Sequence, residues 1–264
     1  MAIPKIIHYC WLGRNPKPKS VLKCIESWKK YCPDYEIIEW NEDNLDLSSH
    51  LYSRQAYDAK AWAFATDYFR LWIVYTHGGI YLDTDVQILK PLDPLLKNRG
   101  FMGFENDQML NTGLGFGAEP GSEFLLKNMQ AYDSLAFVNE DGTFNRRPAP
   151  EYTTEAAISL GLTADTGRPQ QVLDMTCYPR EYFSPKDYFT GIIRTTRNTY
   201  TIHHYSSTWF TQEEQTRRKR DLAVERARYF TRLPRSLAEK ALGTKRYKHM
   251  VASIKGLLPK GKRK

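Results

Sequence analysis

The sequence predicts an α/β protein built on an open, mostly parallel sheet, and three observations predict it. Residues 5–11 (KIIHYCW) are almost continuously apolar, as expected for a strand that helices cover on both faces. A helical segment and a second strand at 34–40 follow, in the order of a right-handed parallel β-α-β unit. A third strand, at 80–82, leads into Asp83 and Asp85. Because ligands of such sheets bind beyond the carboxyl ends of the strands, these aspartates are expected at a binding site.

Two helices separate the predicted strands. The first is expected over residues 20–32, with Ser20 in the N-cap position. The second is expected from residue 57 to residue 77, and Gly78 and Gly79 end it because glycine tolerates a positive φ. The second helix is apolar nearly all round, which indicates that it is buried.

The remainder of the chain is predicted in less detail. An edge element is expected at 89–92 and a region of loops at 141–182, with one short helix at 154–160. Further strands are expected at 101–105, 113–118 and 200–204, and a further helix is expected at 122–132.

Charge divides the chain into two parts. Residues 217–264 hold 17 basic and 3 acidic residues, a net charge of +14, whereas residues 1–216 hold 21 basic and 27 acidic residues, a net charge of −6. We therefore expect a main domain at 1–212 and a basic, helical C-terminal extension at 213–264. The extension either packs on the domain with a solvated basic face or binds an anionic membrane surface. Nucleic-acid binding is less favoured, because no nucleic-acid motif accompanies the charge.

The compartment is expected to be the cytoplasm. No apolar run near the N-terminus has the length of a signal peptide, and no segment approaches the roughly 20 apolar residues of a membrane span. The cysteines lack the spacing of zinc ligands or of a disulfide framework, so we expect reduced thiols at Cys10, Cys24, Cys32 and Cys177.

Asp83 and Asp85 are candidate ligands for a divalent cation. Mg²⁺ and Mn²⁺ bind through one or two carboxylates together with phosphate oxygens of the substrate. The alternative is an ordinary turn, because Asp-x-Asp is common and Asp favours turns. An apolar strand leading directly into the pair favours the metal site, since a charge cluster without compensation would be costly there.

Three further sets of polar and aromatic side chains are candidates for the site. Asp67 and Arg70 lie three residues apart on one face of a buried helix, where charged residues are seldom fully buried unless they are paired or functional. Their alternative is a surface ion pair. Either His203 or His204 is a candidate metal ligand, the alternative being a hydrogen-bonded core histidine. Trp11 is either a core residue or a platform for a nucleobase.

A family resemblance rests on five segments of the sequence. These are KIIHYCWLG, CIESWKKYCPDYEIIEWNEDN, AFATDYFRLWIVYTHGGIYLDTDV, NTGLGFGAE and HHYSSTW. Together they resemble glycosyltransferase family 32, the DXD-motif sugar transferases of bacterial surface polysaccharide synthesis, including capsular polysaccharide and lipopolysaccharide. The resemblance extends more remotely to the large glucosylating toxins. It implies a GT-A type, Rossmann-like fold and a nucleotide-sugar donor used with Mn²⁺ or Mg²⁺.

The resemblance also implies roles for individual residues. The expected donor contacts are Trp11 on the nucleobase, Asp67 and Arg70 on the ribose and the sugar, Tyr81 and Asp83, and Ser207 and Trp209 on the diphosphate. The expected metal ligands are Asp83, Asp85, His204 and Ser207; a histidine at 204 departs from the toxins, which have a glutamate there. Asp83, Asp85 and Arg70 are the expected catalytic residues.

The reaction implied by the resemblance is transfer of a hexose with retention of configuration. The family favours uridine-linked galactose or glucose over guanosine-linked mannose, with a saccharide acceptor, lipid-linked in our interpretation. Such an enzyme would be cytoplasmic or peripheral on the inner face of the plasma membrane. Two alternatives remain: a phosphohydrolase of the haloacid-dehalogenase type that uses Asp83 and Asp85, and a non-catalytic membrane-binding module.

Overall fold

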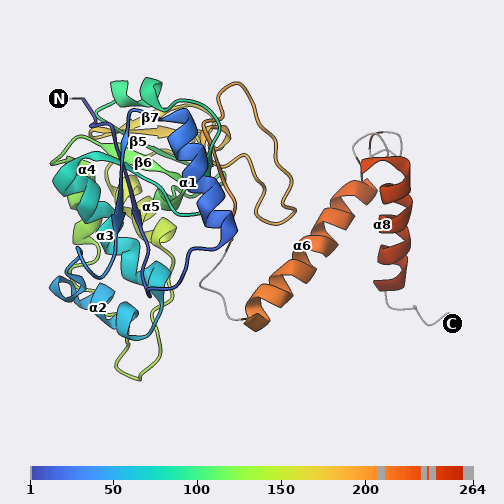
Figure 1. The fold of residues 1–264 in the computed structure, drawn as a ribbon, viewed down its shortest axis with the longest axis horizontal. Helices are drawn as coiled ribbons and strands as arrows, with labels where there is room; N and C mark the ends of the chain where they lie inside the picture. The colour runs from blue at the N-terminus through green and yellow to red at the C-terminus, as the bar shows by residue number, and fades with distance from the viewer. Residues whose placement is uncertain (1, 207–211, 233–236, 238–241, 258–264) are drawn as a thin grey trace. The chain divides into compact units, whose positions relative to one another are not determined.

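The computed structural model describes residues 2–206, 212–232, 237 and 242–257 (Figure 1). Within α8 it leaves out the side chains of residue 250 and residues 253–257. Contacts divide the chain into two units, which we describe separately. The first comprises residues 1–185 and 194–209, and the second comprises residues 186–193 and 210–264.

The first unit is organised around a seven-stranded sheet. In spatial order its strands are β2 (Glu36–Trp40), β1 (Ile6–Cys10), β3 (Gly79–Tyr81), β6 (Phe116–Ala118), β5 (Gly100–Gly103), β8 (Met175–Tyr178) and β7 (Gln170–Val172). Of these strands, β6 and β7 run against the other five. A second, two-stranded sheet pairs β4 (Val86–Ile88) with β9 (Thr201–His203). The prediction of a mixed α/β fold with a mostly parallel central sheet is confirmed.

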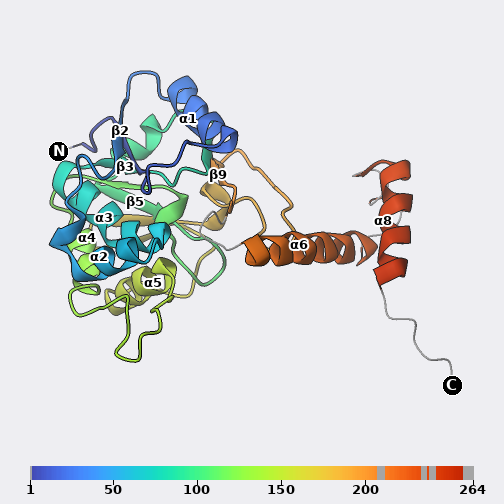
Figure 2. The same cartoon turned by 60° about the horizontal axis from the view of Figure 1, so that its bottom comes forward.

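Helices cover both faces of the large sheet (Figure 2). On one face lies α1 (Lys19–Tyr31). On the other lie α2 (Leu51–Asp58), α3 (Trp62–His77), α4 (Glu123–Gln130) and α5 (Ala149–Ser159). Short 3-10 helices occupy Leu47–Ser49, Asp93–Lys97, Thr112–Leu114 and Arg180–Tyr182.

Successive side chains of the central strands point to opposite faces of the sheet and pack in two apolar cores. Ile80 of β3 packs in the core under α1, and Tyr81 packs in the core under α3. Because successive side chains of a strand point to opposite faces, this is the pattern of a sheet buried on both sides. All four cysteines are buried and free.

Most predicted elements of the first half are present, with shifted bounds. The predicted helix 57–77 is two helices, because the chain turns at Lys60, whose φ is +58°. The first helix begins at Lys19, and Pro18 rather than Ser20 occupies the N-cap position. Pro18 has an extended backbone, and no side-chain hydrogen bond caps the start of this helix.

The prediction of loops over 141–182 was wrong in part. The segment contains α5, which begins earlier than the predicted helix, and the strands β7 and β8. These strands lie at one end of the sheet and are three and four residues long, too short for a clear period in the sequence. The predicted edge element at 89–92 is also displaced, since the strand is β4 at Val86–Ile88.

The second unit contains α6 (Gln212–Arg232), α8 (Thr244–Leu257) and a short hairpin at 186–193. The hairpin is closed by a bridge between Lys186 and Ile193. Both helices are rich in Lys and Arg. Among the described residues, no helix is both long and apolar enough to span a membrane.

Candidate active site

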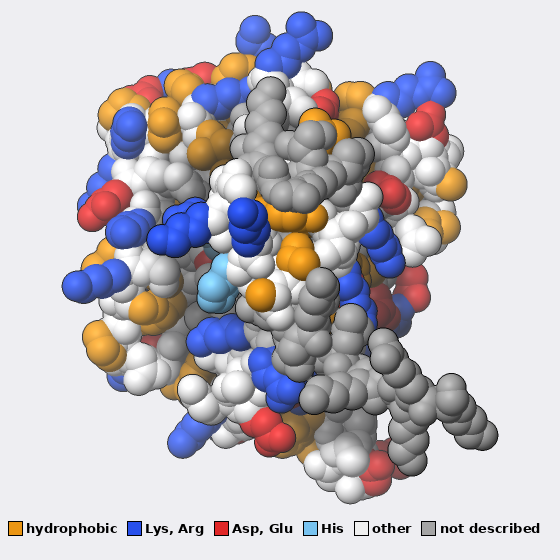
Figure 3. Space-filling model, turned by 90° about the vertical axis from the view of Figure 1, so that its right-hand side faces the viewer, with side chains coloured by type: hydrophobic (Ala, Val, Ile, Leu, Met, Phe, Trp, Pro, Cys, Tyr) orange, Lys and Arg blue, Asp and Glu red, His pale blue; other side chains and the backbone are white. Residues whose placement is uncertain are grey.

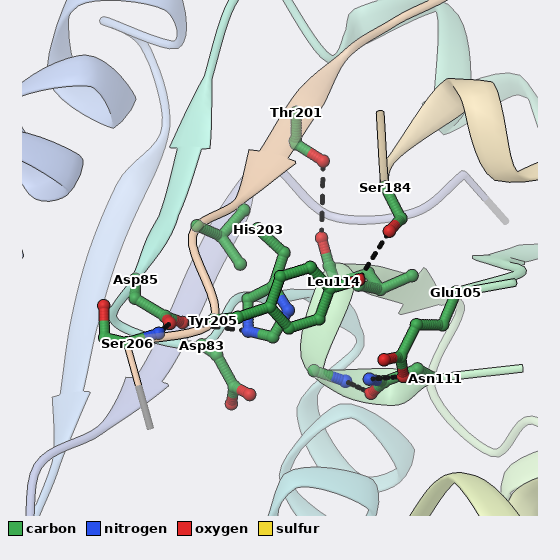
Figure 4. Close-up of polar contacts among 12 residues, drawn as sticks. Asp83, Asp85, Glu105, Asn111, Leu114, Ser184, Thr201, His203, Tyr205 and Ser206 are labelled. Carbon is green, nitrogen blue, oxygen red and sulfur yellow. Dashed lines mark hydrogen bonds and ion pairs between the residues drawn. The ribbon is translucent and has the colours of Figure 1, made fainter. Parts of the chain in front are cut away.

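The candidate site lies where β3 ends, at the carboxyl edge of the parallel strands. β1 and β3 run parallel with Ile7 opposite Ile80, and the Leu82 N–H still donates to the His8 carbonyl oxygen beyond the strand end. The chain then leaves the large sheet through Asp83 and Asp85 and enters β4. Pairing of β4 with β9 places His203 opposite Val86, next to the two aspartates. His203 and the two aspartates, about 120 positions apart in the sequence, therefore lie at the same edge of the sheet (Figure 4).

Asp83, Asp85 and His203 form a cluster of possible metal ligands. One ligand atom from each lies within 4.8 Å of the others. His203 Nε2 lies 3.0 Å from Asp85 Oδ1, and the Ser206 N–H donates to Asp85 Oδ2 over 2.7 Å. Burial alone would raise the pKa of Asp85, but His203 and the Ser206 N–H outweigh it and hold that pKa well below its usual value. Asp85 is therefore an ionised carboxylate.

Arg70 ties the cluster to helix α3. Its Nη2 lies 2.9 Å from Asp67 Oδ1 and its Nη1 lies 3.3 Å from Asp83 Oδ1. Asp67 and Arg70 are both buried, so the alternative of a surface ion pair is excluded by their position. Burial raises the pKa of Asp67 and the Arg70 guanidinium opposes that rise. The guanidinium thus compensates the negative charges of two carboxylates at once, because its planar group presents several N–H donors.

The Tyr81 ring packs against Arg70. The Arg70 guanidinium lies over the ring, 5.4 Å from its centroid, and the ring itself is buried. Sequence reasoning placed Tyr81 in contact with the donor. The structure shows this ring buried against Arg70, and its contact with the donor stays a prediction.

Gly113 packs directly against Asp83. A Cβ added to Gly113 would lie 2.4 Å from Asp83 Oδ2, so a side chain at this position would displace the Asp83 carboxylate. The Gly113 N–H donates to Asn111 Oδ1, and Asn111 Nδ2 donates to Glu105 Oε2 over 2.7 Å. This chain of contacts holds a third carboxylate, Glu105, beside the cluster (Figure 4).

His204 is not a member of the cluster formed by Asp83, Asp85 and His203. Its Nε2 lies 3.0 Å from Gln87 Oε1, and it borders a cavity of about 270 Å³ together with Asp85 and Ser206. Lys23, Ser20 and Cys24 of α1 line the other side of this cavity. Because consecutive residues of an extended chain point to opposite sides, only one of the two histidines can join both aspartates. The structure brings His203 into the cluster, whereas sequence reasoning assigned His204.

Trp11 lies one residue beyond β1, at the same edge of the sheet. It is partly exposed, its Nε1 donates to the Asn15 carbonyl oxygen, and Lys17 Nζ lies 5.7 Å from the centre of its ring. An aromatic ring that is anchored and still accessible is suited to stacking. Ser207 and Trp209, the remaining predicted site residues, lie outside the described residues.

The cluster fits a divalent cation. Two carboxylates and an imidazole are a donor set used for Mn²⁺ and related metals, and the paired oxygen and nitrogen of Asp85 and His203 lie close enough to share one ion. Nδ1 of His203 is buried and has no hydrogen-bond partner in the described part of the chain. The ring contacts Asp85 through its other nitrogen, Nε2.

Residues 18–102 match the family model described as "Glycosyltransferase sugar-binding region containing DXD motif". That range contains Asp67, Arg70, Asp83 and Asp85. The chain contains a DXD-type glycosyltransferase region. The match confirms the resemblance seen in the sequence, and it identifies Asp83-Thr84-Asp85 as the one D-x-D triplet within those residues.

Among the curated proteins similar to this chain are fungal mannosyltransferases. "Inositol phosphoceramide mannosyltransferase 3" of Schizosaccharomyces pombe is 30% identical over 52% of this chain and 39% of the relative. "Inositol phosphoceramide mannosyltransferase 1" of the same organism is 27% identical over 58% of this chain and 47% of the relative. "Initiation-specific alpha-1,6-mannosyltransferase" of Candida albicans is 34% identical over 36% of this chain and 27% of the relative. The chain thus spans less than half the length of these relatives.

Solved structures of glycosyltransferases are also similar to this chain. "PaToxG Glycosyltransferase" has a TM-score of 0.45 at 18% identity and covers 60% of this chain and 70% of that one. A glycosyltransferase involved in glycosylation of the major capsid of PBCV-1 has a TM-score of 0.45 at 13% identity, over 83% of this chain and 99% of that one. The fold assignment depends on the sheet topology itself, because both TM-scores are below 0.5.

Proposed function

We propose that this glycosyltransferase transfers a mannosyl residue from a nucleotide-activated mannose to a hydroxyl group, in a reaction that depends on a divalent cation. The observation that carries the proposal is the cluster of Asp83, Asp85 and His203 at the carboxyl edge of the sheet, whose two aspartates lie inside the DXD-type region. Sequence reasoning favoured uridine-linked galactose or glucose. The relatives are named as mannosyltransferases, so guanosine-linked mannose becomes the preferred donor.

Asp83, Asp85 and His203 would hold the cation. Their imidazole nitrogen favours Mn²⁺ over Mg²⁺, which prefers oxygen ligands alone. When bound, the cation would neutralise charge on the departing diphosphate as a Lewis acid. The three side chains are held by separate elements, namely the end of β3, the start of β4 and the end of β9. The three metal ligands are therefore brought together only in the folded chain.

Arg70 supplies a fixed positive charge beside the cluster. It is buried and held by Asp67, Asp83 and the Thr66 hydroxyl, so it needs little reorganisation when negative charge develops nearby. Prearranged charge of this kind is a large contribution to many enzymatic rate enhancements. We propose that Arg70 stabilises the leaving diphosphate, and that transfer proceeds on one face of the sugar with retention.

The remaining donor contacts are proposals from the family resemblance. Trp11 would stack on the nucleobase, and its partly exposed ring suits that role. Ser207 and Trp209 would close over the diphosphate. His204 and Ser206 line the cavity next to Asp85, where they could contact donor oxygens without being ligands of the cluster.

A lipid-linked acceptor is also proposed. Two relatives are named for the mannosylation of inositol phosphoceramide, a lipid. We propose a cytoplasmic protein that works at the inner face of the plasma membrane, with a saccharide or lipid-linked acceptor and no nucleic-acid partner. The phosphohydrolase alternative lacks support, because the matched region is that of a sugar transferase.

A donor panel tests the proposal. Release of sugar from guanosine-linked mannose, uridine-linked glucose and uridine-linked galactose is measured with Mn²⁺, for the wild type and for Asp85→Asn. We expect turnover of the mannosyl donor and a loss of at least about 100-fold in the variant. Asp43→Asn, on an exposed aspartate outside the site, is the matched control. Turnover of a uridine donor alone would overturn the mannose assignment, and equal rates in Asp85→Asn would overturn the site.

A further inference from the structure

The hairpin at 186–193 presents aromatic side chains that the donor site does not use. Phe189 at its tip is 69% exposed, and Tyr188 and Ile193 are exposed as well. Large apolar residues gathered on one protruding segment are typical of interaction surfaces. We call this segment the aromatic hairpin.

Hydrogen bonds within the aromatic hairpin, from both backbone and side chains, close its turn. The Gly191 N–H donates to the Asp187 carbonyl oxygen, and the Asp187 carboxylate accepts from the N–H and the hydroxyl of Thr190. Gly191 has a φ of +67°, which closes the turn. The exposed ring of Phe189 is therefore carried by an ordered turn.

Helix α6 joins the aromatic hairpin to a basic surface. The Arg218 guanidinium lies over the Tyr188 ring, 4.1 Å from its centroid, and a Cβ on Gly191 would lie 3.8 Å from Leu222. Arg218 and Leu222 are four apart and so share one side of the helix. Elsewhere on α6 the exposed residues include six basic ones, Arg217, Lys219, Arg220, Arg226, Arg228 and Arg232, against the acidic Glu213 and Asp221. On the face drawn in Figure 3, Lys and Arg side chains are more prominent than Asp and Glu side chains.

We propose that the aromatic hairpin and the exposed basic residues of α6 dock the protein on an anionic lipid bilayer. Aromatic rings partition to the headgroup level of bilayers, and Lys and Arg near the surface are attracted by anionic lipids. Both kinds of side chain belong to one unit of the chain, so they can engage one surface together. The inference adds the hairpin to the membrane role expected of the C-terminal extension, and it does not depend on the identity of the donor.

Vesicle flotation of the full-length protein tests this inference. Vesicles of phosphatidylcholine alone are compared with vesicles that also contain phosphatidylserine, at low and high salt. We expect binding to the anionic vesicles only, weakened by salt because surface charges are screened. Phe189→Ala should lower partitioning about fivefold, and the double variant Lys219→Glu with Arg220→Glu should lower it more than about tenfold.

The matched controls change the same kinds of side chain, an exposed aromatic ring and two exposed basic residues, in the first unit. Phe144→Ala removes an exposed ring from a loop of the first unit, and Lys29→Glu with Lys30→Glu reverses two exposed charges on α1. Both controls should float like the wild type. Transfer to a soluble acceptor is measured in parallel, so a wrong donor assignment would leave flotation intact. Absence of binding to anionic vesicles, an unchanged Phe189→Ala, or binding to a DNA duplex without vesicle binding would overturn the inference.

Discussion

The guanidinium of Arg70 lies 3.3 Å from the carboxylate of Asp83 and connects the DXD motif to helix α3. Removing one partner of a buried ion pair leaves the other charge uncompensated, which costs about 3–5 kcal/mol. For this arginine two carboxylates would be affected, because Asp67 bonds to the same guanidinium. The contact therefore links the stability of the fold to the geometry of the site.

Arg70→Lys tests that link. Lysine keeps the charge but lacks the planar fork, so it should fail to hold Asp67 and Asp83 together. We expect the transfer rate to fall at least about tenfold and the free energy of unfolding to fall by about 2 kcal/mol. Rates come from the donor assay and stability from urea unfolding. Arg54→Lys, in the exposed pair with Asp58, should change stability by less than about 0.5 kcal/mol. Equal effects of the two variants would contradict the role of Arg70.

Gly113→Ala tests the close approach to Asp83. The new methyl group would lie 2.4 Å from Asp83 Oδ2, so the carboxylate must move. We expect weaker Mn²⁺ affinity and a loss of about 1–3 kcal/mol of stability, measured by calorimetry and urea unfolding. Gly167→Ala is the control, because its Cβ would meet Asp165 only at 3.5 Å. Full Mn²⁺ affinity in Gly113→Ala would show that Asp83 does not need its present position.

Substituting His203 and His204 one at a time shows which of the two binds the metal. The cluster contains His203, so His203→Gln should weaken Mn²⁺ binding at least about tenfold. His204 contacts Gln87 instead, and His204→Gln should change Mn²⁺ affinity less than about threefold. Titration of Mn²⁺ by electron paramagnetic resonance measures both. The reverse order of effects would restore the assignment made from the sequence.

His8 is predicted to make stability depend on pH. Trp40 Nε1 donates to His8 Nδ1, and His8 Nε2 faces the Gly78 carbonyl oxygen, so the ring must be neutral. Burial lowers the pKa of His8 from 6.5 to about 4. The unfolded chain then binds more protons between pH 6.5 and 4, and stability should fall by up to about 3 kcal/mol as the pH falls through that window.

His8→Gln removes this titration and can keep both hydrogen bonds. Its stability should change less than that of the wild type between about pH 6.5 and pH 5, measured by urea unfolding at each pH. His77→Gln is the control, because that ring lies 6.2 Å from His8 without sharing its hydrogen bonds. Parallel pH profiles for the wild type and His8→Gln would be inconsistent with a buried neutral ring.

The local part of the site was predictable from the sequence, and the part made by strand pairing was not. Asp83, Asp85 and Arg70 lie within one helix–strand segment, so their spacing alone indicates that they share a site. The choice between His203 and His204 depends on the register of β9 against β4, which the sequence does not reveal.

Two further residues of the site, Glu105 and Asn111, were missed as candidates. Both follow β5 in the chain. The position of β5 between β6 and β8 depends on the sheet topology, which the sequence does not reveal. The glycine-rich segment that contains Gly113 was the available signal, since glycine often marks a close approach of backbone to another group.

We propose that Asp83 and Asp85 hold a cation that in turn binds the donor diphosphate. Its most direct test is calorimetric titration of guanosine diphosphate into the wild type and Asp85→Asn, each with and without Mn²⁺, after circular dichroism has shown that the variant is folded. We expect the wild type to bind guanosine diphosphate only with Mn²⁺, and Asp85→Asn to bind it at least about tenfold more weakly. Equal affinity in the two proteins, or binding that is indifferent to Mn²⁺, would contradict it.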